Sequence, residues 1–265
     1  MKAALFAFCL IGLAGFASAG PARPTVVSLD YCADQFVLAL ADRDQILAVS
    51  RDAERKFSHL RGKAAGIPKV RAAAEDVVAL QPDIVVRSWG GDARALSLYE
   101  RFGIRTVQIG YGEDIESAKQ VTRAVAAEIG QAARAEALIA ALPPPRPPTG
   151  VSALYVTPGG VSAGEGTMID AIMTYAGLEN ANGGTGWTGL PLERLVQAPP
   201  ALMLTAFFGF DDDATDRWSV SRHPVMQRLM REAKVVAMDE SRVSCPAWLV
   251  ADEADAIARA LEAAP

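Results

Sequence analysis

Residues 114–148 decide how this chain is organised, and they read DIESAKQVTRAVAAEIGQAARAEALIAALPPPRPP. Up to Leu142 this stretch is rich in Ala, Glu, Gln, Lys and Arg, which favour helix. Gly130 interrupts the pattern, and we expect it to divide the stretch into two helices. Residues 143–148 hold five prolines around Arg146, which predicts a stiff extended spacer without core-forming side chains.

Short apolar runs alternate with helical patterns on both sides of this stretch. Strands are predicted at residues 25–29, 46–49, 83–87, 106–109, 152–156, 201–204 and 235–238. Helices are predicted at 33–41, 75–80, 93–102, 168–176, 192–197, 226–233 and 249–261. Such alternation is typical of right-handed crossovers and a largely parallel sheet. The sequence therefore predicts an α/β fold with a helical bridge between two α/β lobes.

The amino terminus has the pattern of a secretory signal peptide. Lys2 precedes a short apolar run, and Ala17-Ser18-Ala19 forms a small-residue cleavage site. The alternative is a membrane anchor, but about 15 apolar residues are short for a span of about 20. Cys9 lies inside the run rather than at its end, so we do not interpret it as a lipid-modified cysteine. We expect residues 1–19 to be removed and the mature chain to be exported as a soluble protein.

Composition excludes several classes of function. The 265 residues carry a formal net charge of −5 and no Lys/Arg run, which argues against nucleic-acid binding. Hydrophobic residues make up 51% of the chain and charged residues 22%, which is typical of a globular protein. The two histidines, His59 and His223, are too few for a multi-histidine zinc site.

Cys32 and Cys245 would lie in an oxidising compartment after export, where paired thiols tend to form disulfides. The sequence leaves three alternatives open for this pair: a structural disulfide, two free thiols, or a soft-metal site.

Residues 160–164 match the G-x-S-x-G motif of serine hydrolases and supply the alternative function. Ser162 would be the nucleophile, with His223 and either Asp212 or Asp216 completing a triad. The motif requires a helix directly after the serine, whereas Gly164-Glu165-Gly166 intervenes here. The sequence therefore weighs against an exported hydrolase that uses Ser162.

Two further motifs give little support to a nucleotide-binding or calcium-binding function. Gly110-Tyr111-Gly112 lacks the third glycine of a dinucleotide-binding loop. Asp211-Asp212-Asp213 with Asp216 lacks the spacing and the distal Glu of a calcium loop, so a solvated acidic turn is the better interpretation.

Aromatic side chains follow several predicted strands, where the carboxyl ends of a parallel sheet line a ligand crevice. Large aromatics on loops there favour a bulky, partly apolar ligand, although each could instead pack on its own lobe. The guanidinium of Arg87 would suit an anionic or amide oxygen on that ligand, or form a surface ion pair. The set comprises Arg87, Trp89, Trp187, Phe207 and Phe208.

The whole mature chain resembles the periplasmic substrate-binding proteins of cobalamin and iron-siderophore importers, and most of all their cobalamin-binding members. The matching stretches are residues 26–29, 75–85, 89–91, 103–104, 164–166 and 177–180, Trp187 with Glu193, and the closing helix. The resemblance implies two Rossmann-like lobes joined by a single long rigid helix, the class III periplasmic binding fold, with the ligand between the lobes. We divide the chain into a signal peptide (1–19), an amino-terminal lobe (20–130), a bridging helix with a Pro-rich linker (131–148) and a carboxyl-terminal lobe (149–265).

The resemblance also implies roles for particular residues. Glu75 and Glu193 stand where family members present one exposed Glu per lobe to a membrane permease. Ala176 and Ala258 stand where the cobalamin-binding members have a disulfide, whereas Cys32 and Cys245 fall at motifs that face the cleft. The implied ligand contacts are Tyr31, Cys32, Arg87, Trp89, Trp187, Phe207, Phe208 and Cys245.

We therefore expect a periplasmic solute-binding component of an ABC importer rather than an enzyme. Its expected ligand is a metal chelate, with a corrinoid such as cobalamin first, a ferric siderophore second and heme third. We expect no catalytic residue, bound cofactor, metal ligand or nucleic acid. The expected partners are the ligand and a permease dimer with its ATPase subunits, and the mature protein is expected to be a monomer.

Overall fold

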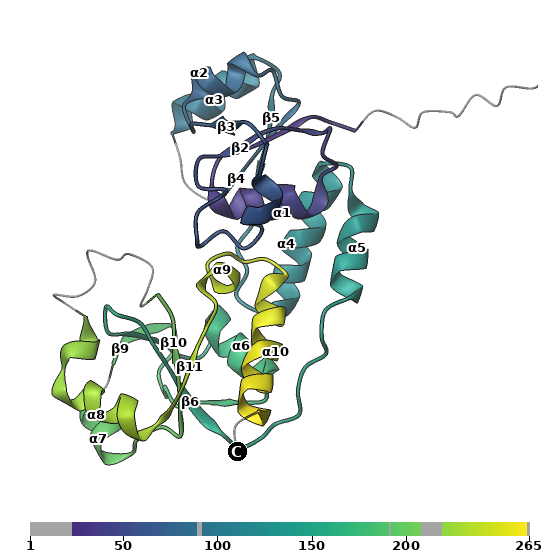
Figure 1. The fold of residues 1–265 in the computed structure, drawn as a ribbon. Helices are drawn as coiled ribbons and strands as arrows, with labels where there is room; N and C mark the ends of the chain where they lie inside the picture. The colour runs from purple at the N-terminus through teal and green to yellow at the C-terminus, as the bar shows by residue number, and fades with distance from the viewer. Residues whose placement is uncertain (1–22, 89–91, 191, 208–218, 264–265) are drawn as a thin grey trace, which may run out of the picture.

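The computed structural model describes residues 23–88, 92–190, 192–207 and 219–263, which form two α/β lobes stacked one above the other (Figure 1). The expected signal peptide at 1–19 lies outside the described residues.

The amino-terminal lobe is built on a five-stranded sheet whose pairings are all parallel. The strand order is β3 (Lys69–Val70), β2 (Ile46–Ser50), β1 (Val26–Ser28), β4 (Ile84–Arg87) and β5 (Arg105–Gln108). Its helices are α1 (Tyr31–Leu40), the 3₁₀ turn η1 (Arg61–Ala64), α2 (Ala74–Ala79) and α3 (Ala93–Arg101). Buried side chains on one face of this sheet, including Phe36 and Val86, form the amino-terminal core. The opposite face packs under α2 and α3 around Val85 and Tyr99.

The carboxyl-terminal lobe has a four-stranded parallel sheet and a two-stranded antiparallel ribbon. The parallel order is β11 (Lys234–Ala237), β10 (Leu202–Thr205), β6 (Ser152–Val156) and β8 (Glu179–Asn180), and the ribbon pairs β7 (Val161–Ala163) with β9 (Trp187–Gly189). The helical elements are α6 (Met168–Tyr175), α7 (Leu192–Gln197), the 3₁₀ turn η2 (Val220–Arg222), α8 (Pro224–Glu232), α9 (Glu240–Val243) and α10 (Leu249–Glu262). The carboxyl-terminal core lies between this sheet and helices α6 and α10.

Two helices occupy the stretch that opened the sequence analysis, α4 (Ile115–Glu128) and α5 (Ala132–Ala140). They separate at Gly130, whose φ of +74° is readily adopted only by glycine, so the expected break is confirmed. The carboxylate of Asp114 begins α4 by accepting a hydrogen bond from the Ser117 N–H, in a capping box.

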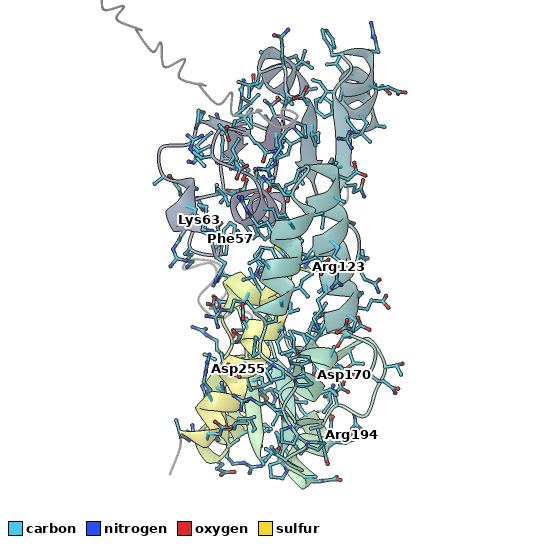
Figure 2. The ribbon with its side chains drawn as sticks, turned by 90° about the vertical axis from the view of Figure 1, so that its right-hand side faces the viewer. Phe57, Lys63, Arg123, Asp170, Arg194 and Asp255 are labelled. Atoms are coloured by element: carbon cyan, nitrogen blue, oxygen red, sulfur yellow. A yellow bond between two sulfur atoms is a disulfide. The ribbon has the colours of Figure 1, made fainter. Side chains whose placement is uncertain are left out.

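Helix α4 bridges the lobes. Ile115 and Ala118 belong to the carboxyl-terminal core, whereas Val121 and Val125 belong to the amino-terminal core. In Figure 2, Arg123 of α4 lies at mid-height, between Phe57 of the upper lobe and Asp255 of α10. The sequence-based boundaries placed the bridge at residues 131–148, and Leu142 of that segment also packs against both cores.

The Pro-rich linker is held along the carboxyl-terminal lobe by an ion pair and hydrogen bonds. The Arg146 guanidinium lies 2.6 Å from the Asp255 carboxylate, and the Arg146 N–H donates to the carbonyl of Tyr175 at 2.8 Å. The Tyr175 hydroxyl donates to the carbonyl of Pro143 at 2.7 Å. The linker therefore runs as an extended strap over α6 and α10, which agrees with the stiff spacer that its prolines predict.

Within the described ranges, no helix is both long and apolar enough to cross a membrane.

Candidate ligand-binding site

A cavity of about 650 Å³ lies between the two lobes. The amino-terminal lobe lines it at the carboxyl ends of β1, β4 and β5, the edge at which parallel sheets bind ligands. The other wall comes from the turn before α6, the start of β9, and the loop between α9 and α10. The lining residues are Tyr31, Cys32, Ser88, Ile109, Gly110, Tyr111, Gly112, Glu113, Gly166, Thr167, Met168, Gly186, Trp187, Val243, Ser244, Cys245 and Pro246.

Asp30 fixes the amino-terminal edge of this cavity. One carboxylate oxygen caps α1 by accepting from the Ala33 N–H at 2.9 Å. The other accepts from the Ser88 N–H at 2.7 Å. The single carboxylate thus ties the end of β1 to the end of β4 and holds Tyr31 at the cavity.

Cys32 and Cys245 form a disulfide, with their Cα atoms 5.5 Å apart across 213 residues of sequence. The structure therefore selects one of the three alternatives that the sequence left open. Both cysteines line the cavity, so the disulfide forms part of its wall and joins the first turn of α1 to the segment before α10.

Among the described residues, three aromatic side chains line the cavity: Tyr31, Tyr111 and Trp187. Trp187 is 59% exposed and Tyr111 is 75% exposed, so both present large faces that are available to a ligand. The Trp187 ring meets the buried ring of Tyr155 edge to face at 6.1 Å, which orients it. Tyr31 makes a similar contact with Phe57 at 5.0 Å.

Carboxylates perturb the tyrosines around the cavity. Burial, together with the nearby carboxylates of Asp30 and Asp52, raises the pKa of the Tyr31 hydroxyl. Burial and the Glu240 carboxylate raise the pKa of Tyr155, which packs behind Trp187. Both hydroxyls are therefore protonated and neutral at physiological pH.

The side chains that could donate to a metal carried by a ligand are the hydroxyls of Tyr31 and Tyr111, the carboxylate of Glu113 and the thioether of Met168. No group of three or more His, Cys, Asp or Glu residues that could hold a metal ion occurs in the part of the chain that the structure describes.

The structure brings together four of the eight expected ligand contacts: Tyr31, Cys32, Trp187 and Cys245 all line the cavity. Trp89 and Phe208 lie outside the described residues.

The other two expected contacts lie away from the cavity lining. Arg87 is 7% exposed, and its Nε donates to the carbonyl of Ser88 at 3.4 Å, so it stands behind a lining residue. Phe207 has a φ of +66°, packs against the carboxyl-terminal core, and donates its N–H to the Glu240 carboxylate at 3.0 Å.

Tyr111, Glu113 and Met168 are lining residues that the sequence analysis did not select. Tyr111 lies three residues after the end of β5, so the same strand-end rule that selected Trp89 could have found it. Its motif, Gly110-Tyr111-Gly112, was considered only as a dinucleotide-binding loop, and it was rejected because the third glycine is missing.

Glu75 and Glu193 are both exposed, in the first turns of α2 and α7. One lies on each lobe, and the helices α2 and α7 that carry them stand at opposite ends of the molecule (Figure 1).

Ser162 does not form a nucleophile elbow. It lies in the middle of β7, paired with Thr188 of the antiparallel ribbon, and α6 begins only at Met168. Its residue is fully buried, and its hydroxyl has no hydrogen-bond partner among the described residues. His223 serves as the cap of α8, and Asp212 and Asp216 lie outside the described residues. A serine in this setting is not accessible to a substrate.

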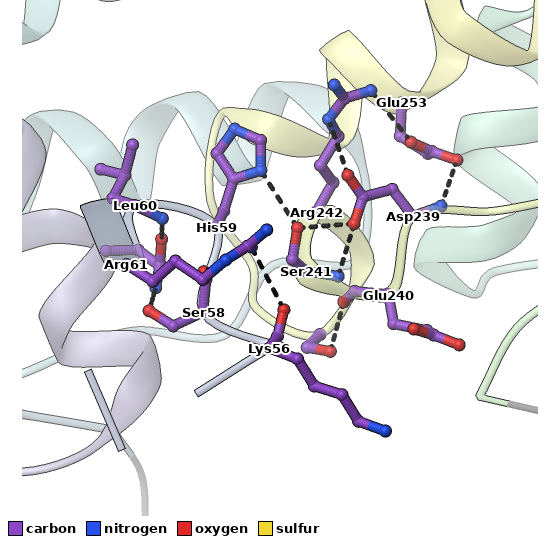
Figure 3. Close-up of polar contacts among 12 residues, drawn as sticks. Lys56, Ser58, His59, Leu60, Arg61, Asp239, Glu240, Ser241, Arg242 and Glu253 are labelled. Carbon is purple, nitrogen blue, oxygen red and sulfur yellow. Dashed lines mark hydrogen bonds and ion pairs between the residues drawn. The ribbon is translucent and has the colours of Figure 1, made fainter. Parts of the chain in front are cut away.

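A group of polar contacts also joins the lobes beside the cavity wall (Figure 3). His59 Nδ1 lies 3.1 Å from Ser241 Oγ, and the Ser241 hydroxyl donates to the Asp239 carboxylate at 2.6 Å. Arg242 bridges Asp239 and Glu253 at 3.5 and 3.3 Å. Burial and the Arg242 charge lower the pKa of His59, so its imidazole is neutral and can donate from Nδ1 to the serine.

Comparison with known structures places this fold. A periplasmic heme-binding protein from Pseudomonas aeruginosa aligns with a TM-score of 0.67 and 22% identity, over 92% of this chain and 95% of that chain. The periplasmic heme-binding protein HutB of Vibrio cholerae gives 0.65 and 21%, over 91% and 99%. The periplasmic vitamin B12-binding protein BtuF of Vibrio cholerae gives 0.59 and 15%, over 91% and 97%.

No protein-family model and no curated protein sequence matches the chain. The chain has the two-lobe fold of class III periplasmic binding proteins, as its sequence predicts.

Proposed function

We propose that this protein is the periplasmic solute-binding component of an ABC importer, which captures a bulky metal chelate between its lobes and delivers it to a membrane permease. The observation that carries the proposal is the cavity of about 650 Å³ lined from both lobes and walled by aromatic side chains. Its volume lies within the ordinary range for sites that enclose small molecules. The fold is shared with proteins described as binding heme and vitamin B12, which supports this class of ligand.

The proposed mechanism is capture rather than catalysis. Trp187 and Tyr111 would cover the flat faces of a macrocycle or chelate, and the hydroxyl of Tyr31 would contact its polar edge. Both α4 and the Cys32–Cys245 disulfide cross between the lobes, so relative motion of the lobes is restricted. A cleft that is largely formed before binding loses little conformational entropy when the ligand arrives.

Titration of intrinsic tryptophan fluorescence tests the proposal. The mature protein is titrated with cyanocobalamin, a ferric hydroxamate siderophore and hemin, which represent the three expected ligand classes in their expected order. Saturable binding at one site per chain supports the carrier function. Absence of binding by all three, together with ester hydrolysis that Ser162→Ala abolishes, would instead restore the hydrolase alternative.

We further propose that Glu75 and Glu193 dock the two lobes on a permease dimer. Each carboxylate is favoured at its helix start by only about 0.3–1 kcal/mol, so neither is needed for folding. Exposed charges of this kind mainly set orientation and association rate, and they weaken with salt.

The double variant Glu75→Ala, Glu193→Ala should bind ligand normally and melt within a few degrees of wild type. It should fail to stimulate transport in vesicles that carry the cognate importer. A matched control changes Glu100 and Glu179, which are also exposed and lie one on each lobe, and should transport normally. Normal transport by the first variant would show that its two residues are only helix-start carboxylates.

A further inference from the structure

We propose that the cleft selects its ligand by charge, accepting a neutral or cationic chelate and disfavouring one that carries free carboxylates. The inference rests on the proposed carrier function and names the ligand class within it.

The charge of the cavity lining is the first observation. Among the described residues that line the cavity, Glu113 is the only charged one. The others are aromatic, aliphatic, sulfur-containing, hydroxyl or glycine residues. An anionic ligand would therefore meet a carboxylate and no ammonium or guanidinium group in this wall.

More carboxylates stand directly behind the lining. Asp30 and Asp52 are close enough to Tyr31 to act on its hydroxyl. Glu240 acts in the same way on Tyr155, the ring against which Trp187 packs. Carboxylates therefore lie near both aromatic walls, in addition to Glu113 in the lining itself.

Three described arginines lie beside a lining residue, or beside a ring that packs on one, without lining the cavity themselves, and each makes a contact elsewhere. Arg87 is buried and donates to the Ser88 carbonyl. Arg242 is held between Asp239 and Glu253. Arg55 lies over the Phe57 ring, with its guanidinium carbon 5.9 Å from the ring centre. None of the three lines the cavity.

The aromatic lining adds to this preference. Tyr31, Tyr111 and Trp187 surround one space, and the faces of such rings attract cations. Aromatic rings beside a carboxylate, with no basic group in the described lining, form a site for a positive or neutral group. Heme bears two carboxylates, so we infer that this cleft is poorly suited to it although the fold is shared with heme-binding proteins. A corrinoid with amide side chains, or a ferric trihydroxamate with a free amine, fits the same wall.

Three matched pairs of probes test the inference by fluorescence titration at low salt. Each pair keeps the chelate and changes its charge: ferrioxamine B and its N-succinyl derivative, cyanocobalamin and its monocarboxylic acid, and hemin dimethyl ester and hemin. In whichever class binds, the member with fewer carboxylates should bind about fivefold more tightly, and raising the salt concentration should shrink the ratio.

Glu113→Lys should abolish or reverse that ratio. The matched control Glu100→Lys changes the net charge equally on the exposed surface of α3, away from the cavity lining, and should leave the ratio unchanged. Equal or tighter binding of the carboxylate-bearing member by the wild type would overturn the inference while the carrier function stands. Binding of none of the six probes would refute the carrier function and the inference with it.

Discussion

Reducing the Cys32–Cys245 disulfide should destabilise the protein more than any single change of a surface residue. The crosslink joins residues 213 apart, and it therefore closes most of the mature chain into one loop in the unfolded state. The loss of loop-closure entropy for that length corresponds to about 5 kcal/mol at 25 °C in the chain-entropy model, and crosslinks commonly deliver about 2–4 kcal/mol. In a chain of this size each kcal/mol moves the melting temperature by about 2–4 °C.

The assay is urea unfolding of the mature protein with and without a dithiol reductant, with thiols counted in the unfolded state. Zero free thiols before reduction and two after reduction verify the chemical change. The double variant Cys32→Ala, Cys245→Ala is the matched control, because reductant should not alter its unfolding midpoint. A decrease of less than about 1 kcal/mol in the free energy of unfolding on verified reduction would refute this reasoning. It would mean that residual contacts already hold the two segments together in the unfolded chain.

Three further predictions concern single side chains. Trp187→Ala should weaken ligand binding by about 1–3 kcal/mol in a fluorescence-independent titration, while Phe102→Ala, which removes an aromatic ring that is 61% exposed and distant from the cavity lining, should not. Burial outweighs the hydrogen bonds from Ser28 and Ser50 and raises the pKa of Asp34, so the contribution of Asp34 to the free energy of unfolding is most favourable below the unfolded pKa and declines as pH rises through the folded pKa. Asp34→Asn should therefore cost less stability in urea unfolding at pH 7 than at pH 4, and a larger cost at pH 7 would contradict the assignment. Ser162→Ala should leave ligand binding intact and raise the free energy of unfolding by about 1 kcal/mol, because a buried hydroxyl without a partner is removed; a clear loss of stability would show that the hydroxyl is hydrogen-bonded.

Local patterns predicted seven of the nine strands of the two parallel sheets, because each of these seven is a short apolar run bounded by turn residues. They missed β3 and β8, which have only two residues each and include the polar residues Lys69, Glu179 and Asn180. The local patterns did not predict the antiparallel ribbon of β7 and β9, and the reason is physical. Its glycines read as loop signals, yet Gly164 is needed where two backbones approach closely: a Cβ there would lie 2.1 Å from the Gly184 carbonyl oxygen. Trp187 was therefore expected on a loop, whereas it belongs to a strand.

Long-range relations were the harder part of the prediction. Residues on both sides of Gly130 favour helix, so the sequence does not reveal which of the two helices contributes buried side chains to both cores. The pairing of Cys32 with Cys245 stayed open for the same reason, since only the folded chain brings their Cα atoms together. The strand-end rule predicted a ligand crevice at the carboxyl ends of parallel strands, and the residues after β1, β4 and β5 do line the cavity, because parallel topology alone fixes where those ends meet. Trp187 was selected from a Gly-rich stretch instead, and it lies at the start of the antiparallel strand β9.

The segment that enters the amino-terminal core from the far end of the chain bears on the timing of folding. Trp248 packs edge to face on Phe36 with ring centres 5.7 Å apart, and Cys245, Ala247 and Leu249 belong to the same core. A ribosome produces Phe36 more than 200 residues before it produces Trp248. A growing chain therefore holds an incomplete amino-terminal core until residues 245–249 have been made. Chains truncated before residue 245 should remain sensitive to protease throughout both lobes.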